Sequence, residues 1–186
     1  MTKSFWVAVK FTVVTTILFG LAYPLVVTGL SQWWFPRQAN GSLIEKNGQI
    51  VGSRLIGQSF TGEKYFHSRP SAAGNGYDAG ASSSSNLGPT NKALVDRVNA
   101  DVAKLQVEHP GMAVPADLVT TSGSGLDPDI SPAAAEFQVA RVAKVRGLSE
   151  DEVRKIVARH MSGRDLGVLG EARVNALGVN LELDGK

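Results

Sequence analysis

The stretch from Phe11 to Leu30 reads FTVVTTILFGLAYPLVVTGL and contains no charged side chain. As an α-helix, these residues would be about 30 Å long, which matches the thickness of the hydrocarbon core of a bilayer. Trp33, Trp34 and Phe35 follow directly, as aromatic residues do at a membrane–water interface. The stretch therefore predicts one transmembrane helix, and it divides the chain into a stub (residues 1–10), a span (residues 11–30) and a domain (residues 36–186).

The charges on either side of the span predict its orientation. Lys3 and Lys10 lie in the stub, which has no acidic residue, whereas the first charge beyond the span is Arg37. Because positively charged flanks stay in the cytoplasm, we expect a cytoplasmic stub and an extracytoplasmic domain. The alternative is a cleaved signal peptide, but the apolar run exceeds the h-region of about 7–15 residues that such peptides have.

Small side chains recur every four residues along the span. Ala8, Thr12, Thr16 and Gly20 are the candidate residues for packing against another membrane helix, because small residues at this spacing let two helices approach closely. An equally weighted alternative is that the threonine hydroxyls bond their own backbone and face lipid. Pro24 predicts a kink, since it removes a backbone hydrogen-bond donor.

The composition of the domain excludes several functions. Beyond the span, 17 of the 19 Lys and Arg residues balance the 17 Asp and Glu residues, so no basic block indicates nucleic acid. The chain has no cysteine, and His67, His109 and His160 lie too far apart in sequence to form a typical metal pair. The sequence has neither a Gly-x-Ser-x-Gly elbow nor a phosphate-binding loop. We therefore expect no metal site and no catalytic set.

The remaining pattern predicts a single mixed α+β domain with long Gly/Ser-rich loops. The clearest signals are those of a helix pair, in which Ser131 caps the first helix before Pro132 and Ser149 forms a capping box with Glu152 in the second. We expect strands at 49–56, 116–121 and 171–184, and helices from a cap at Thr90 to 106, from 132 to 146 and from 149 to 162.

Two loops, residues 70–89 and 122–132, are long for a compact domain, and such loops are usually functional or disordered. We expect the first to fold back, with Tyr77 and Leu87 as apolar anchors. The candidate partner-facing residues of the two loops are Tyr77, Ser122, Ser124 and Asp127.

Two further groups of polar residues stay open to more than one interpretation. Asp127 and Asp129 could hold a cation, although carboxylates beside a proline more often belong to turns and caps. Gln138, Arg141, Lys144 and Arg146 form a polar strip on the helix at 132–146, either as a solvated face, which is the default, or as a partner surface.

Three segments together resemble one family. They are the N-terminal anchor, the tract GSRLIGQSFTGEKYFHSRPSA (52–72) with YDAGASSSSNLGPTN (77–91), and VPADLVTTSGSGLDPDISPAAAEFQVARVAKVRGLS (114–149). Together they are similar to KdpC, the C subunit of the Kdp ATP-driven potassium pump, over essentially the whole chain. Asp129 departs from the family's Leu-Asp-Pro-x-Ile-Ser segment, where a histidine is common, and this leaves the role of Asp129 open.

The resemblance implies a non-catalytic accessory subunit of a high-affinity potassium import complex in the cell inner membrane. It implies as partners the potassium-binding subunit KdpA, the P-type ATPase subunit KdpB, the small single-span subunit KdpF and membrane lipid. ATP and K+ would be handled by the complex, and no cofactor is expected on this chain. Alternatives from other classes are a membrane-tethered extracytoplasmic hydrolase and a secreted binding protein.

The resemblance further implies help in assembly and a catalytic chaperone activity that raises the apparent ATP affinity of the ATPase subunit, with Gln138 and Arg141 linked to the nucleotide. The predicted topology places these two residues across the membrane from cytoplasmic ATP. We therefore expect the effect on ATP to be allosteric.

Overall fold

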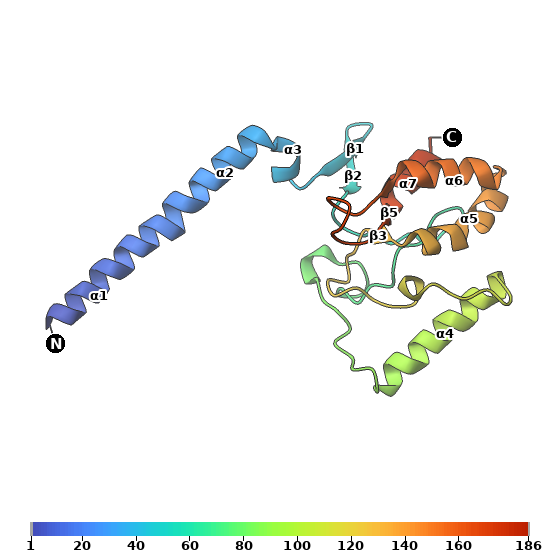
Figure 1. Cartoon of the computed structure of the whole chain (residues 1–186), viewed down its shortest axis with the longest axis horizontal. Coiled ribbons are helices and arrows are strands. Elements are labelled where there is room, and N and C mark those ends of the chain that lie inside the picture. Colours follow the sequence, from blue (N-terminus) through green and yellow to red (C-terminus); the bar gives the residue numbers. More distant parts are fainter. Residues whose placement is uncertain (1, 186) are drawn as a thin grey trace. The chain divides into compact units, whose positions relative to one another are not determined.

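The computed structural model describes residues 2–185 and divides into two compact units, residues 1–51 and 52–186. Residues 1 and 186, the two ends of the predicted stub and domain, lie outside the described part. The first unit is dominated by one continuous helix, Thr2–Trp34, with a mean hydropathy of 2.0 over its most apolar window and with its side chains exposed (Figure 1). The helix is long and apolar enough to cross a membrane. It begins at Thr2, so it also includes the residues expected to form the stub.

Pro24 is accommodated by a change of helix type. The helix consists of α1 (Thr2–Thr15), a π-helical turn η1 (Thr16–Ala22) and α2 (Tyr23–Trp34). In an α-helix the proline ring clashes with the carbonyl four residues back. In this chain the helical turn that precedes Pro24 is a π turn, which is wider than an α-helical turn. The N–H of Tyr23 donates to the oxygen of Leu18, five residues back. The disturbance expected at Pro24 therefore takes the form of a π turn, through which the ribbon continues in Figure 1.

A short helix and a hairpin follow the apolar helix. These are α3 (Pro36–Ala39), β1 (Leu43–Lys46) and β2 (Gln49–Ser53), the two strands being paired. Asn47 and Gly48 join the strands with φ angles of 54° and 75°, as a two-residue hairpin turn requires. The strand expected at 49–56 is present but ends at Ser53. Its partner was not expected, although the Asn-Gly pair signals such a hairpin.

The second unit packs three helices against a small sheet. The helices are α5 (Pro132–Arg146), α6 (Glu150–Arg159) and α7 (Ala176–Leu183), and the antiparallel sheet has the order β3 (Asp129–Ile130), β5 (Arg173–Asn175), β4 (Met161–Ser162). Side chains from the three helices, from β3 and β5, and from the segment that contains Phe66 meet in the core: Phe66, Ile130, Phe137, Val139, Val142, Val153, Ile156, Val174, Val179 and Leu183. The prediction of mixed helix and sheet is confirmed.

The predicted helix pair is confirmed together with its caps. Ser131 Oγ accepts from the N–H of Ala134 at 3.0 Å, and Ser149 forms the expected capping box with Glu152. Gly147 ends α5 with φ at 67°, in the left-handed region where glycine has no steric cost. The second helix is shorter than expected: it ends at Arg159 and His160 is its C-cap, because β4 begins at Met161.

The predicted terminal strand, 171–184, is wrong beyond Asn175. Asn175 ends β5 and caps α7, since its Oδ1 accepts from the N–H of Gly178 at 3.0 Å. Ala176, Val179 and Leu183 are buried along α7. Their spacing has the period of a helix and not the alternation of a strand.

Two further expectations in the middle of the chain are corrected. The strand expected at 116–121 is instead a 3₁₀ turn, η3 (Ala116–Leu118), and another such turn, η2 (Ala79–Ala81), lies in the first loop. The helix expected to be capped by Thr90 is α4 (Lys92–Glu108), and its cap is Asn91, whose Oδ1 accepts from the N–H of Ala93 at 2.9 Å.

Candidate functional site

The two long loops contact each other. The N–H of Ser83 and the hydroxyl of Ser82 both donate to the carbonyl oxygen of Ser124, each at 3.0 Å. Gly125 follows with φ at 68°, and a Cβ at this position would lie 2.5 Å from the oxygen of Ser83 and 2.8 Å from the nitrogen of Ala73. We call these five residues the loop junction. Only a glycine at position 125 lets the two backbones approach this closely.

Tyr77 closes the first loop on itself. Its hydroxyl donates to the carbonyl oxygen of Arg69 at 2.5 Å, and its N–H donates to Ser71 Oγ at 2.8 Å. Burial raises the pKa of the Tyr77 hydroxyl, so it stays protonated as the donor that this contact needs. Leu87, the other expected anchor, remains 37% exposed, so only Tyr77 folds inward.

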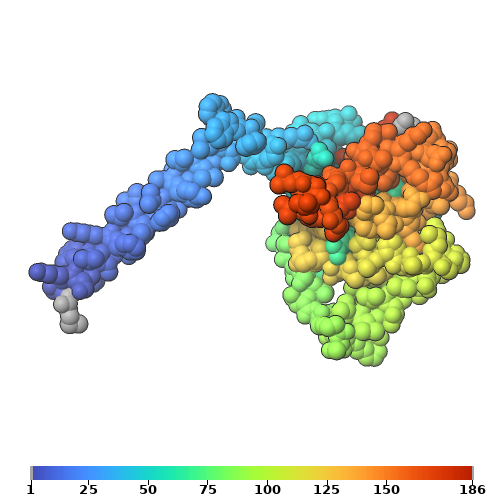
Figure 2. Space-filling view, viewed as in Figure 1, coloured from blue at the N-terminus to red at the C-terminus, as the bar shows by residue number. Residues whose placement is uncertain are grey.

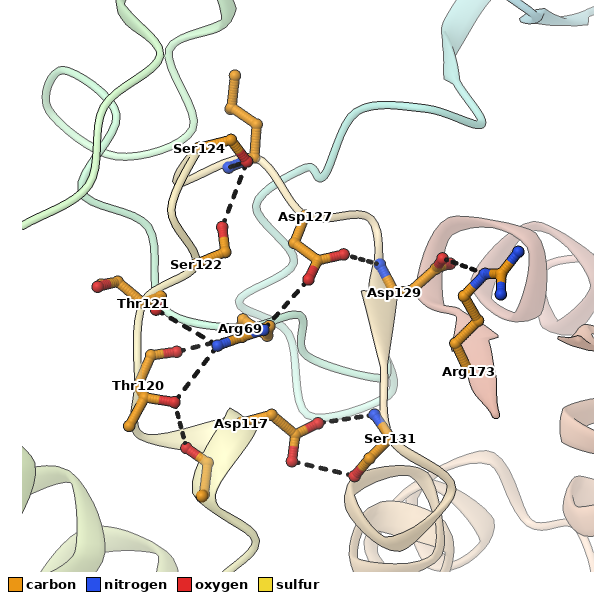
Figure 3. Close-up of polar contacts among 12 residues, drawn as sticks. Arg69, Asp117, Thr120, Thr121, Ser122, Ser124, Asp127, Asp129, Ser131 and Arg173 are labelled. Carbon is orange, nitrogen blue, oxygen red and sulfur yellow. Dashed lines mark hydrogen bonds and ion pairs between the residues drawn. The ribbon is translucent and has the colours of Figure 1, made fainter. Parts of the chain in front are cut away.

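A cleft of about 540 Å³ lies beside the second loop, and Arg69 and Asp127 are among the residues that line it (Figure 3). The guanidinium of Arg69 donates to Asp127 Oδ2 at 3.2 Å, to the oxygen of Thr121 at 3.3 Å and to Thr120 Oγ1 at 3.4 Å. Arg69 therefore ties the two residues that precede the second loop to Asp127 in the middle of that loop. This arginine was not among the predicted site residues, because the partners of its guanidinium lie more than 50 residues away along the chain.

The structure gives Asp129 an internal role. Its Oδ2 pairs with Arg173 Nε at 3.3 Å, and its Oδ1 accepts from Asn175 Nδ2 at 3.1 Å, so it links β3 to β5. Asp127 in turn pairs with Arg69 and accepts from the N–H of Asp129 at 3.0 Å. Each carboxylate is thus neutralised by its own arginine. Within residues 2–185, no three or more histidine or acidic side chains are grouped so that they could hold a metal ion.

Asp117 is another residue of this cleft that sequence reasoning missed. Its carboxylate accepts from the N–H of Ser131 at 2.7 Å and from the Ser131 hydroxyl at 3.0 Å. These contacts tie η3 to the start of α5. The carboxylate also adds negative charge at a helix N-terminus, where the helix dipole favours it.

The polar strip of α5 holds another segment of the domain in place. Gln138 is only 3% exposed, and its side chain accepts from the N–H of His67 at 2.7 Å and donates to the His67 oxygen at 3.2 Å. Arg141 donates to the carbonyl oxygens of Glu63 and of Tyr65, the latter at 3.1 Å.

Arg146 completes this arrangement. It donates to the oxygen of Lys64 and to that of Leu183, both at 2.7 Å, and it pairs with Asp184 at 2.9 Å. We call Gln138, Arg141 and Arg146 the segment clamp, because they hold residues 63–67 against α5. The default interpretation of the strip as a solvated face is therefore wrong for these three residues and holds only for Lys144, which is exposed.

Arg141 of the segment clamp lies beside His67 and beside a second cleft, and its charge affects both. Burial, followed by the positive charge of Arg141, lowers the pKa of His67 below its usual 6.5, so His67 is neutral at pH 7. A second cleft, of about 460 Å³, opens beside Arg141, and Glu63, Glu108 and Lys144 also line it. Glu108 pairs with Arg141 Nε at 3.3 Å. The carboxylates of Glu63 and Glu108 balance the positive charges of Arg141 and Lys144, so this cleft has no excess of positive charge to attract the phosphates of a nucleotide.

The family model and the similar known proteins all point to the same family. Residues 5–185 match the family described as KdpC: K+-transporting ATPase, c chain. A potassium-transporting ATPase KdpC subunit of Koribacter versatilis is 60% identical over 185 residues, covering 100% of this chain and 96% of the relative. The KdpC subunit of Acidobacterium capsulatum is 58% identical over 95% of both chains, and that of Rhodospirillum rubrum is 60% identical over 91% of this chain and 89% of the relative.

Proposed function

Since this chain belongs to the KdpC family of potassium-transporting ATPase subunits, we propose that it is a single-pass, non-catalytic subunit that assists assembly and ATP use from the extracytoplasmic side. Family membership itself supports an accessory role in potassium import. The observation that carries the proposal is the match over residues 5–185, which includes both the apolar helix and the domain. The proposed partners are the potassium-binding subunit KdpA, the ATPase subunit KdpB and the small subunit KdpF.

We propose that the apolar helix contacts a partner through Ala8, Thr12, Thr16 and Gly20. A Cβ added at Gly20 would meet only Thr16 Cγ2, at 3.8 Å, so the space beside this glycine is open to a neighbour from outside the chain. Thr15, which lies next to the stripe, bonds its own backbone through a donation to the oxygen of Phe11 at 2.9 Å. The stripe residues thus provide a shallow surface suited to close helix packing.

Gly20→Leu should reduce recovery of the intact complex. The added side chain would separate the two helices at their closest approach, and we expect a loss of about tenfold, equivalent to about 1.4 kcal/mol. The measurement is the amount of each partner subunit that copurifies with a tag on this chain in mild detergent. Val14→Leu is the control, since it adds bulk off the stripe. Equal recovery of both variants would eliminate the proposed packing surface.

We propose that the effect on ATP is allosteric. The lysines of the stub favour a cytoplasmic N-terminus and hence a domain on the opposite side from cytoplasmic ATP. The side chains of Gln138 and Arg141 are occupied in the segment clamp, which supports a role for both residues in the shape of the domain. The domain would then bias the pump between states through different contacts in each state.

A topology experiment tests the proposal. The chain has no cysteine, so a single cysteine in place of exposed Ser124 or of Val107, which is 81% exposed, gives one reactive thiol. In cells whose outer barrier is permeable but whose inner membrane is intact, both should react with a thiol reagent that cannot cross the inner membrane. Ser4→Cys, which keeps both lysines of the stub, is the matched control and should react only after that membrane is opened. The reverse pattern would invert the topology and restore direct nucleotide contact as the explanation.

A further inference from the structure

The connection between β4 and β5 carries exposed apolar side chains. Asp165 and Leu169 bond to each other across it, by donations of 2.8 and 2.9 Å between their backbones. Leu166, Val168 and Leu169 are 90%, 72% and 58% exposed. We call residues 165–169 the apolar tip. The orange-red spheres of this connection lie on the outer surface of the domain in Figure 2. Exposure of apolar side chains to water is unfavourable, and clusters of them on a surface mark sites of interaction.

The apolar tip is held in one conformation. The N–H of Gly167 donates to the oxygen of Arg164, and that of Val168 donates to the oxygen of Asp165, both at 3.2 Å. Arg164 also pairs with Glu171 at 2.8 Å across the base of the tip. Leu166 has φ at 53°, a left-handed conformation that is unfavourable for leucine. Because the 90% exposed side chain makes little contact that could offset this strain, the conformation points to a role outside the domain.

The charges around the apolar tip indicate the kind of partner. Arg164 pairs with Glu171, and Arg173 lies 3.7 Å from Asp165 and 3.3 Å from Asp129. These residues leave no excess of positive charge for an anionic lipid surface, and the tip has no Trp or Tyr of the kind that anchors loops at a bilayer interface. A small, rigid, apolar projection with internally paired charges instead fits an apolar pocket in a protein.

We propose that the apolar tip inserts into an apolar pocket on another subunit of the potassium-transporting ATPase complex. The inference rests on the proposed function, since it requires that the chain work within such a complex. Because the tip is preformed, docking orders little additional backbone. Leu166 and Val168, the two most exposed side chains of the tip, enter the pocket first.

The first test measures dissociation. Leu166→Asn together with Val168→Thr removes the apolar surface while it keeps a residue that tolerates the left-handed conformation at position 166. A tag on the full-length chain holds the complex in detergent, and we expect loss of the other subunits to become about tenfold faster. Val107→Thr is the matched control, since Val107 is 81% exposed on α4, and it should change the rate by less than about twofold.

The second test labels the apolar tip directly. Leu166→Cys carries a polarity-sensitive fluorophore, and its emission should shift to shorter wavelength on assembly of the complex but not in the chain alone in lipid nanodiscs. The same label on Val107→Cys should not shift. If the double variant unfolds at a lower temperature than the wild type, its dissociation rate no longer reports on docking alone. The fluorescence shift then tests the docking independently.

The outcomes separate this inference from the proposed function. A wild-type chain that recovers no other subunit would refute the proposed function and the docking together. Recovery with unchanged dissociation in a stably folded double variant, or with no shift at residue 166, would refute only the docking. A shift in nanodiscs without partners would identify lipid as the occupant and would also overturn it.

Discussion

Replacing Asn180 with leucine should remove a large part of the stability of the domain. Asn180 lies in α7, is 1% exposed, and holds the backbone of Phe66 by accepting from its N–H at 2.8 Å and donating to its oxygen at 2.9 Å. Leucine has the same branched shape, with somewhat more bulk, but would leave both backbone groups buried without partners. Each such group costs about 1–3 kcal/mol. We therefore expect a loss of about 2–6 kcal/mol, against a typical domain stability of about 5–15 kcal/mol.

The measurement must report on the domain rather than on the apolar helix. All three tryptophans, Trp6, Trp33 and Trp34, lie in that helix, so tryptophan fluorescence does not follow unfolding of the domain. Hydrogen exchange of the α5 amides in denaturant does follow it. Asn99→Leu is the matched control, since Asn99 is exposed on α4, and it should change the free energy of unfolding by less than about 0.5 kcal/mol. Equal protection of the two variants would contradict the structural role of Asn180.

The parts of the fold that were predicted correctly depend on neighbours in sequence. Ser131 and Ser149 cap their helices through contacts three residues away, and the apolar helix is defined by length and composition alone. A local pattern is sufficient for such features because the partner of each group lies within one helical turn. The resemblance to KdpC also relies on contiguous segments, so the family could be predicted without any contact map.

The parts that were missed depend on partners far along the chain. Gln138 meets the backbone of His67 across 71 residues, and Asn180 meets Phe66 across 114. A polar side chain on a helix looks the same in sequence whether it binds water or a distant backbone. For this reason the sequence predicts, by default, a solvated face for the polar strip that contains Gln138 and Arg141. The resemblance added a link to nucleotide that remains a prediction.

Gly125→Ala should open the loop junction. The new Cβ would lie 2.5 Å from the oxygen of Ser83 and 2.8 Å from the nitrogen of Ala73, and alanine would also have to keep φ at 68°. The left-handed conformation alone costs about 1–2 kcal/mol, and displacing packed backbone adds about 1–3 kcal/mol. Because Ser83 and Ala73 meet the Cβ through backbone atoms, no side-chain rotation relieves the contact. We expect a loss of about 2–5 kcal/mol or separation of the two loops.

Gly123→Ala provides the control two residues away, because a Cβ at that position meets nothing within 4 Å. Limited proteolysis should cut the Gly125→Ala chain within residues 70–89 and leave the Gly123→Ala chain intact. If Tyr77, Ser122, Ser124 and Asp127 face a partner as predicted, Gly125→Ala should also release partner subunits at temperatures where the core remains folded. The two roles of the loops are separated by the remaining outcomes. Release of partner subunits without proteolysis would indicate a partner contact at residue 125 itself. Proteolysis without release would indicate that the loop junction serves only the fold.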